Sequence, residues 1–253
     1  MKEFPLAGGA RSRPQAERPP GPREGRWPGR ARLAVAAALA ALACQAPKYQ
    51  PYTSPAGDFE CEAPWRWSAT VAGGASNFES VTWSGPFDPA FYEGRPLLIA
   101  RWYAYGRPHV LPDGLWERYA SAADYIQQTL SGVYGPRYVL DQPVTEVKLA
   151  LTGFVAQEFV VSSPMEPRAG ARWGVSVHRQ DGSTVVWRRH AYVVLPMKRG
   201  FYVLIYPATV QGYDLYRSRF DEMVNTFVPL LEGPGGPRIS YGGAEPWSGG
   251  GYH

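Results

Sequence analysis

Two stretches of the chain repeat apolar residues at the spacing of an α-helix. The first covers residues 115–130, where Asp113 can cap the start and Gly132 can end the helix. The second covers residues 216–230 in steps of four and three, with Pro229 limiting it near its end. The two apolar faces consist of Leu115, Tyr119, Ala122, Ala123, Ile126 and Leu130, and of Tyr216, Phe220, Met223, Phe227 and Leu230. The pattern therefore predicts two amphipathic helices.

Other apolar segments have the length and composition of β-strands. They are residues 97–105, 145–150, 154–161, 174–179, 184–194 and 201–206. Leu151-Thr152-Gly153 and Asp181-Gly182 suit tight turns between consecutive strands. Successive hairpins make a sheet mainly antiparallel, and two helices can cover its faces. The sequence thus predicts an α+β domain, a mainly antiparallel sheet flanked by helices.

The residues offer little catalytic or metal chemistry. If Asp181-Gly182 centres its turn, His178 faces Val185, and His190 lies five residues further from the turn, so the two histidines do not form a metal pair. The chain has neither a Cys/His cluster for zinc nor a phosphate-binding loop, and it lacks a nucleophile motif. We therefore predict no catalytic residue, no metal and no cofactor, and hence a protein that is not an enzyme.

The start of the chain has the pattern of an export signal. Residues 33–43 form an unbroken apolar run directly after Arg30 and Arg32. As a helix, this run would span about 16 Å, roughly half of a bilayer core, so it is too short to cross a membrane. Basic residues, an apolar run and a small-residue end are typical of a secretory signal. The region before the run is long for a bacterial signal, which leaves open a true start further along the chain.

The run ends at Ala41-Leu42-Ala43 and is followed by Cys44, which resembles a bacterial lipobox. The resemblance implies cleavage before Cys44 and its acylation, as in palmitate-bearing lipoproteins. Gln45 in place of Asp implies sorting to the outer membrane, on its periplasmic face. A plain secretory signal and a buried apolar helix are the alternatives. Cys61 is expected to be a small buried apolar residue; without acylation, a Cys44–Cys61 disulfide becomes possible.

The basic character of the chain belongs to its first part. The formal net charge is +4, but residues 1–43 contain eight Lys and Arg against three Asp and Glu, and the remainder carries a net charge of −1. Because a nucleic-acid-binding protein normally keeps its basic residues on the folded part, we expect no nucleic-acid partner.

These patterns divide the chain into four parts. Residues 1–43 form the lipoprotein-type signal peptide, and residues 44–57 the lipidated cysteine and a tether with three prolines. Residues 58–231 form one globular domain. Residues 232–253 are rich in Gly and Pro and are expected to be a flexible tail. Leader and tail are thus both expected to be disordered.

The order of motifs in the domain resembles the PsbP/DcrB-like group of α/β/α sandwich domains. The matching pieces are residues 54–59, Pro64-Trp65, residues 202–206 and the stripe of Phe220, Met223 and Phe227. The resemblance covers residues 52–231. It implies the sandwich fold and a mostly non-catalytic protein, and it assigns no functional residues.

Two functions fit these observations. The first is a non-catalytic envelope lipoprotein, anchored through Cys44, that binds an unknown envelope protein through an exposed apolar patch. The alternative is a lipoprotein that binds a small ligand or carbohydrate on tryptophan side chains. Trp65 and Trp67 share one face of a segment expected to be extended, and they are the candidate ligand-binding residues. The alternative predicts a concave site lined by tryptophans.

Overall fold

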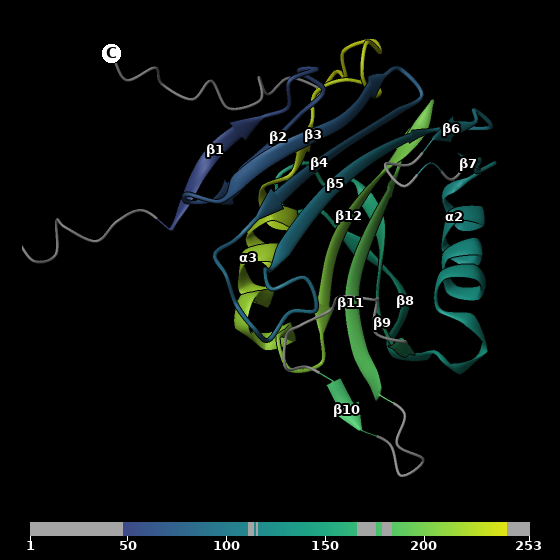
Figure 1. The fold of residues 1–253 in the computed structure, drawn as a ribbon. Helices are drawn as coiled ribbons and strands as arrows, with labels where there is room; N and C mark the ends of the chain where they lie inside the picture. The colour runs from purple at the N-terminus through teal and green to yellow at the C-terminus, as the bar shows by residue number, and fades with distance from the viewer. Residues whose placement is uncertain (1–47, 111–113, 115, 166–175, 179–183, 242–253) are drawn as a thin grey trace, which may run out of the picture. The chain divides into compact units, whose positions relative to one another are not determined.

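Figure 1 shows the computed structural model of the chain, which describes residues 48–110, 114, 116–165, 176–178 and 184–241. The described residues belong to the unit Pro47–His253. Several predictions concern parts of the chain outside the described residues: the signal peptide, Cys44, the Asp113 cap, Leu115, the Asp181-Gly182 turn and residues 242–253.

An eight-stranded antiparallel sheet forms the centre of the domain. Its order is β3-β4-β5-β12-β11-β9-β8, with β10 paired to β11. The strands are β3 (Ser68–Ala75), β4 (Phe78–Ser84), β5 (Leu97–Ala104), β8 (Val139–Lys148), β9 (Val155–Met165), β10 (Ser176–His178), β11 (Thr184–Pro196) and β12 (Gly200–Thr209). Helix α2 (Ala122–Gln128) lies over one face and α3 (Tyr213–Thr226) over the other (Figure 1). The predicted α+β class is confirmed.

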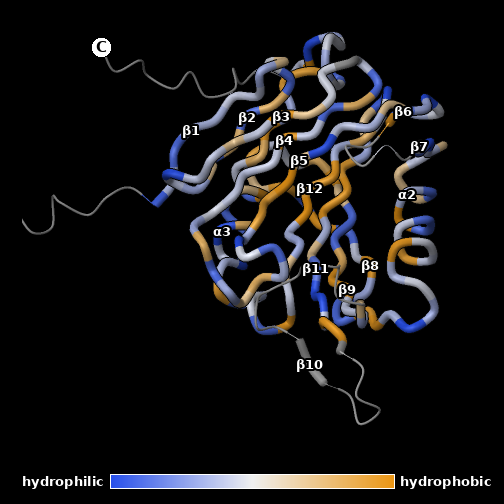
Figure 2. Tube along the Cα trace, in the orientation of Figure 1, coloured by the Kyte–Doolittle hydropathy of each residue, from blue (hydrophilic) through white to orange (hydrophobic). Residues whose placement is uncertain are grey.

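The core has two layers, one on each face of this sheet. Every residue of β12 is buried, because its alternate side chains pack under the two helices. Tyr202 and Leu204 belong to the cluster of α3, whereas Phe201 and Val203 belong to that of α2. The hydrophobic colouring in Figure 2 concentrates around β5 and β12 accordingly.

Two smaller sheets complete the domain. β1 (Tyr49–Thr53), β2 (Phe59–Pro64) and β13 (Val228–Pro229) form one, and β6 (His109–Val110) and β7 (Trp116–Glu117) form the other. β1 lies within residues 45–57, which the sequence assigns to a tether. The structure corrects this assignment: β1 pairs with β2 along its whole length, and the Tyr52 ring packs edge-on against Trp83 at 4.9 Å. The folded part therefore begins before residue 58.

Both helices are shorter than the sequence predicts. α2 begins only after Ser121, whose hydroxyl accepts from the Asp124 backbone N–H, while the Asp124 carboxylate accepts from the Ala120 N–H. A π-helical turn, η1 (Thr129–Val133), and a 3-10 turn, η2 (Gly135–Arg137), follow α2. α3 ends at Thr226, because Phe227 is extended and lets Val228 pair with Glu60. The predicted continuation to residue 230 is wrong.

The predicted hairpins are present, with one shift of register. β8 and β9 are joined through Gly153, whose φ of 69° suits a tight turn. β10 pairs with β11 so that His178 faces Thr184 and Val177 faces Val185. The predicted pairing of His178 with Val185 is therefore off by one residue, and the turn itself lies outside the described residues.

The first part of the predicted flexible tail packs on the domain. The Glu232 carboxylate accepts from the Lys198 N–H at 2.8 Å, and the Tyr241 hydroxyl donates to the Pro229 carbonyl. Gly233 has a φ of 85°, and a Cβ there would lie 2.1 Å from the Trp102 ring. The tail prediction is therefore wrong for residues 232–241.

Gly233→Ala tests this packing. We expect it to lower the free energy of unfolding by about 2 kcal/mol, because the new methyl group would collide with Trp102 and the backbone conformation disfavours a side chain. Gly235→Ala is the control: Gly235 also has a positive φ, of 66°, but open space around its Cβ position. Urea unfolding measures both variants, and equal losses would contradict the docking of this segment against Trp102.

Candidate functional site

Both predicted tryptophans line one cleft of about 350 Å³, which we call the Trp–Arg cleft. The residues that define it are Trp65, Arg66, Trp67, Gly85, Arg95 and Arg219. They come from the turn between β2 and β3, from the loop between β4 and β5, and from α3. The cleft has the tryptophan lining that the ligand-binding alternative expects, and binding of a ligand there stays a prediction.

The turn that carries the tryptophans is not the extended segment predicted. The Trp67 N–H donates to the Pro64 carbonyl at 3.2 Å, and the Trp65 N–H donates to the Lys48 carbonyl at 2.9 Å. Arg66 has a φ of 62°, a conformation that favours Gly or Asn. Among the described residues it is the single non-glycine residue with a positive φ. Such local strain is more frequent at functional sites than elsewhere.

Arg66→Asn separates the backbone role of this residue from its charge. We expect the free energy of unfolding to rise by about 0.5 kcal/mol, because Asn tolerates a positive φ better than Arg. Urea unfolding of the variant and the wild type measures this difference. A loss of more than about 1 kcal/mol would mean that the arginine side chain supports the fold rather than serving the cleft.

The two tryptophans play different parts in the cleft. Trp67 is 7% exposed, and its ring packs against Tyr216 with centroids 5.7 Å apart. A Cβ at Gly85 would lie 2.7 Å from the Trp67 ring, so the absence of a side chain there gives the ring its place. Trp65 is 37% exposed. Trp67 therefore forms a fixed wall, and Trp65 is available to a ligand.

Three arginines give the cleft its charge. Arg66 and Arg95 are exposed, and the half-buried Arg219 guanidinium lies over the Trp67 ring at 5.9 Å from its centroid. None of the described residues that line the cleft is acidic. Sequence analysis missed Arg95 and Arg219, because they lie far from the tryptophans along the chain and no local signal links them. It did not name Arg66 either, although Arg66 lies between the two tryptophans.

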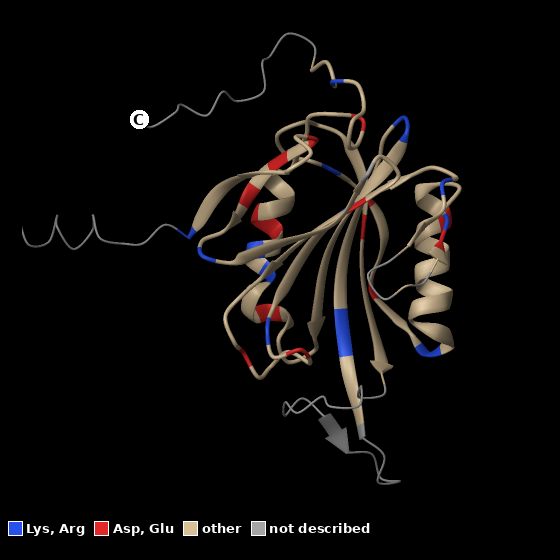
Figure 3. Ribbon diagram, turned by 45° about the horizontal axis from the view of Figure 1, so that its top comes forward, with Lys and Arg blue, Asp and Glu red and all other residues tan. Residues whose placement is uncertain are grey.

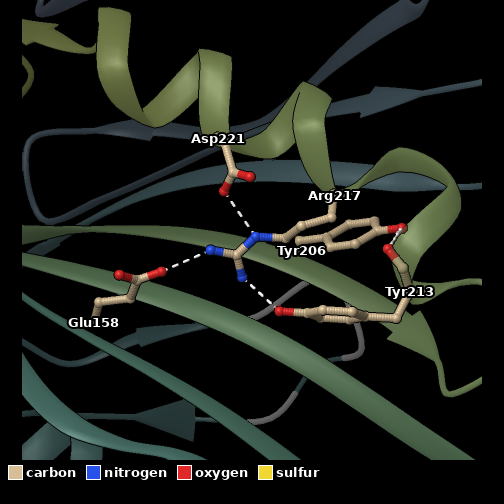
Figure 4. Close-up of polar contacts among 5 residues, drawn as sticks. All are labelled: Glu158, Tyr206, Tyr213, Arg217 and Asp221. Atoms are coloured by element: carbon tan, nitrogen blue, oxygen red, sulfur yellow. Dashed lines mark hydrogen bonds and ion pairs between the residues drawn. The ribbon is translucent and has the colours of Figure 1, made fainter.

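The helix that carries Arg219 is fixed on the sheet by a different arginine (Figure 4). Arg217 donates to Glu158 and to Asp221, each at 2.7 Å, and to the Tyr213 hydroxyl. The Tyr206 hydroxyl donates to the Tyr213 carbonyl at 3.0 Å. Two carboxylates thus neutralise Arg217, whereas Arg219 forms no ion pair within the part of the chain that the structure describes.

Elsewhere, the charged side chains are dispersed or engaged internally. Figure 3 shows a basic segment on β11, which contains Arg188 and Arg189. Arg188 donates to the Ser163 hydroxyl at 2.7 Å, and Arg189 pairs with Asp141 at 3.1 Å. The α2 face of β11 also carries His190, which is buried. Burial and the Arg188 charge lower the pKa of His190 to about 3, so this imidazole stays neutral.

A second, apolar groove of about 360 Å³ lies between α2 and the edge strand β8, and we call it the α2–β8 groove. Its lining includes Ile126, Leu130, Tyr138 and Val144. It resembles the exposed apolar patch expected of a protein that binds a partner.

Three further features are Cys61, groups of metal-ligating side chains, and helices that could span a membrane. Cys61 is a free thiol with 5% exposure, as expected of a small buried residue, and burial raises its pKa. Within the described residues, no three His, Cys, Asp or Glu side chains gather as metal ligands would. No helix in the described part of the chain has the length and apolarity needed to cross a membrane.

Comparisons with known proteins give structural likenesses only. No protein-family model and no curated protein matches the chain. The solution structure of cyanobacterial PsbP (CyanoP) from Synechocystis sp. PCC 6803 is similar, with 13% identity and a TM-score of 0.43, over 74% of this chain and 95% of that one. A crystal structure from Bacteroides thetaiotaomicron VPI-5482 has 10% identity and a TM-score of 0.38, over 72% of this chain and 49% of that one. This chain thus spans about half the length of the Bacteroides protein. The fold class stated above rests on the strand order and the two helices.

Proposed function

We propose that the chain is an exported, non-catalytic binding protein whose Trp–Arg cleft takes an anionic ligand. Acylation of Cys44 holds it in the membrane, at the periplasmic face of the outer membrane. The observation that carries the proposal is the cleft itself, in which an exposed Trp65 and three arginines converge without an acidic lining residue. Tryptophan offers a flat apolar surface to a sugar ring, and arginine offers paired donors to a phosphate or carboxylate.

The lipid anchor in this proposal is supported by the sequence alone. The apolar run of residues 33–43 ends in Ala41-Leu42-Ala43 before Cys44, and Gln45 follows. More than one acyl chain is needed for a stable hold, which bacterial lipoproteins supply.

Titration with glucose 6-phosphate, followed by tryptophan fluorescence, tests the cleft. We expect saturable quenching with the phosphorylated sugar and much weaker binding of glucose, since glucose lacks the anion. Arg95→Gln should weaken the affinity for glucose 6-phosphate about tenfold, because one charged contact is lost. Arg137→Gln is the control: Arg137 is exposed in η2 and does not line the cleft. Equal affinities for the sugar and its phosphate would contradict an anion site.

A second function, binding of an envelope protein, is favoured by the α2–β8 groove. Val144, which lines this groove, is 37% exposed. A photo-crosslinker at position 144 would capture a partner in intact cells if the groove is an interface. The same crosslinker at Leu215, which is exposed on α3, is the control. Equal capture from both positions would contradict a specific groove.

A further inference from the structure

We infer that the anion held in the Trp–Arg cleft is the phosphate of lipid headgroups in the membrane that anchors Cys44. This inference rests on the proposed function, since it identifies the ligand of the same cleft. It makes the cleft a membrane-docking surface and sets the orientation of the domain on the bilayer.

The chain between the anchor and the cleft is short. Cys44 and Lys48 are four residues apart, and four residues span at most about 14 Å when fully extended. The Lys48 carbonyl accepts from the Trp65 N–H at 2.9 Å and from the Arg219 guanidinium at 3.5 Å. The described chain therefore begins at the cleft itself. An acylated Cys44 would keep the cleft close to the headgroups.

The residue types in the cleft also suit a membrane surface. Tryptophan is enriched at the interface between a bilayer and water, where its ring lies among the headgroups. Trp65 is the exposed tryptophan of the cleft, and Arg66 and Arg95 beside it are exposed cations. Each basic residue close to an anionic bilayer strengthens binding roughly fivefold. Lys48, which is also exposed, adds a further positive charge at the same place.

The carboxylates of the loop between β4 and β5 lie outside the lining of the cleft. Asp88 accepts a hydrogen bond from the Ala90 N–H at 2.9 Å, and neither Asp88 nor Glu93 lines the cleft. A phosphate in the cleft therefore meets arginines and no carboxylate among the described lining residues.

Vesicle binding tests the inference on the chain from residue 44 onward, with Cys44→Ser to remove acylation. This chain contains all the described residues, which lie between positions 48 and 241, and hence every strand and helix given above. We expect it to sediment with vesicles of phosphatidylcholine mixed with phosphatidylglycerol, and far less with phosphatidylcholine alone. The pair Arg66→Asn and Arg95→Gln should weaken this binding roughly 25-fold. Added salt should weaken it as well, because charge screening acts on exposed groups.

A matched pair controls for net charge. Arg137→Gln with Arg238→Gln removes the same two charges from exposed positions outside the cleft. It should leave vesicle binding nearly unchanged. If this pair weakens binding as much as the cleft pair does, attraction is a property of the whole surface and the inference is overturned.

The fluorescence of Trp65 can show whether this side chain enters the bilayer. Phospholipids with brominated acyl chains should quench the fluorescence of the vesicle-bound protein, and Trp65→Phe should remove most of that quenching. Unchanged quenching in the variant would place another tryptophan at the membrane and overturn the inference.

Binding of glucose 6-phosphate distinguishes a failure of the proposed function from a failure of the headgroup inference. If glucose 6-phosphate binds the cleft but anionic vesicles bind no better than phosphatidylcholine vesicles, the proposed function stands and the headgroup inference fails. If neither probe binds, both fail.

Discussion

Glu79→Gln is expected to stabilise the domain by about 3 kcal/mol at pH 8 and by less than about 1 kcal/mol at pH 5. Glu79 lies on β4, is 2% exposed, and has one carboxylate oxygen without a hydrogen-bond partner among the described residues. Burial, and then the charge of Asp58, raise the pKa of Glu79 from 4.5 to about 7. The folded state thus favours the protonated carboxyl, which glutamine imitates.

The direction of this pH dependence follows from the protons that the folded and unfolded states bind. Between pH 4.5 and pH 7 the folded protein keeps the Glu79 proton and the unfolded chain has lost it, so the wild type loses stability as the pH rises through this window. The buried His190 acts oppositely: its pKa is lowered to about 3, so its contribution is lost as the pH falls from about 6.5. His190 is common to both proteins. The difference between variant and wild type therefore isolates Glu79.

Urea unfolding at pH 5 and pH 8 gives this difference directly. A constant difference between Glu79→Gln and the wild type at the two pH values would mean that Glu79 titrates alike in the folded and unfolded states. The proposed burial of its charge would then be wrong.

Cys44→Ser is expected to move the protein from the membrane fraction to a soluble fraction and to abolish incorporation of a fatty-acid analogue. The reason is that each buried methylene contributes about 0.8 kcal/mol, so acyl chains outweigh any contact of the cleft with headgroups. Metabolic labelling and fractionation of the cells measure both results.

Cys61→Ala serves as the cysteine control for this experiment. Cys61 is buried in the domain, and its loss removes a thiol without touching the lipobox. This variant should keep both the label and the membrane location. If the label persists in Cys44→Ser or disappears in Cys61→Ala, Cys44 is not the acylated residue.

The sheet could be predicted because its signals are local. Residues 97–105 are apolar on both alternating faces, and β5 (Leu97–Ala104) is indeed covered on both sides. The turn at Gly153 could be predicted as well, because its φ of 69° depends on a single residue and glycine adopts it readily. Periodicity and turn chemistry are thus sufficient for most strands of the large sheet.

The errors arose where distant contacts decide the local structure. β1 forms because its backbone pairs with β2 and the Tyr52 ring meets Trp83, and neither contact is visible in a segment with several prolines. Asp113 and Ser121 are both residue types that cap helices. Trp116 and Glu117, which lie between them, form β7 and pair with β6, so the helix begins only after Ser121. Residues 232–241 read as a tail by composition, yet Gly233 lets them lie on Trp102.

The sequence identified two of the residues that line the Trp–Arg cleft and missed its arginines. Trp65 and Trp67 could be named because they are close together and aromatic. Arg95 and Arg219 could not, since they reach the cleft only through the β4–β5 loop and the docking of α3. The positive φ of Arg66 is likewise a property of the turn and not of its composition.

The most direct measurement is the intact mass and first residue of the protein extracted with detergent from membranes of the native cell. We predict a chain that begins at residue 44 and carries the added mass of a diacylglyceryl group. A chain that begins at Met1, without added mass and in the soluble fraction, would contradict the anchor and the membrane-facing cleft together.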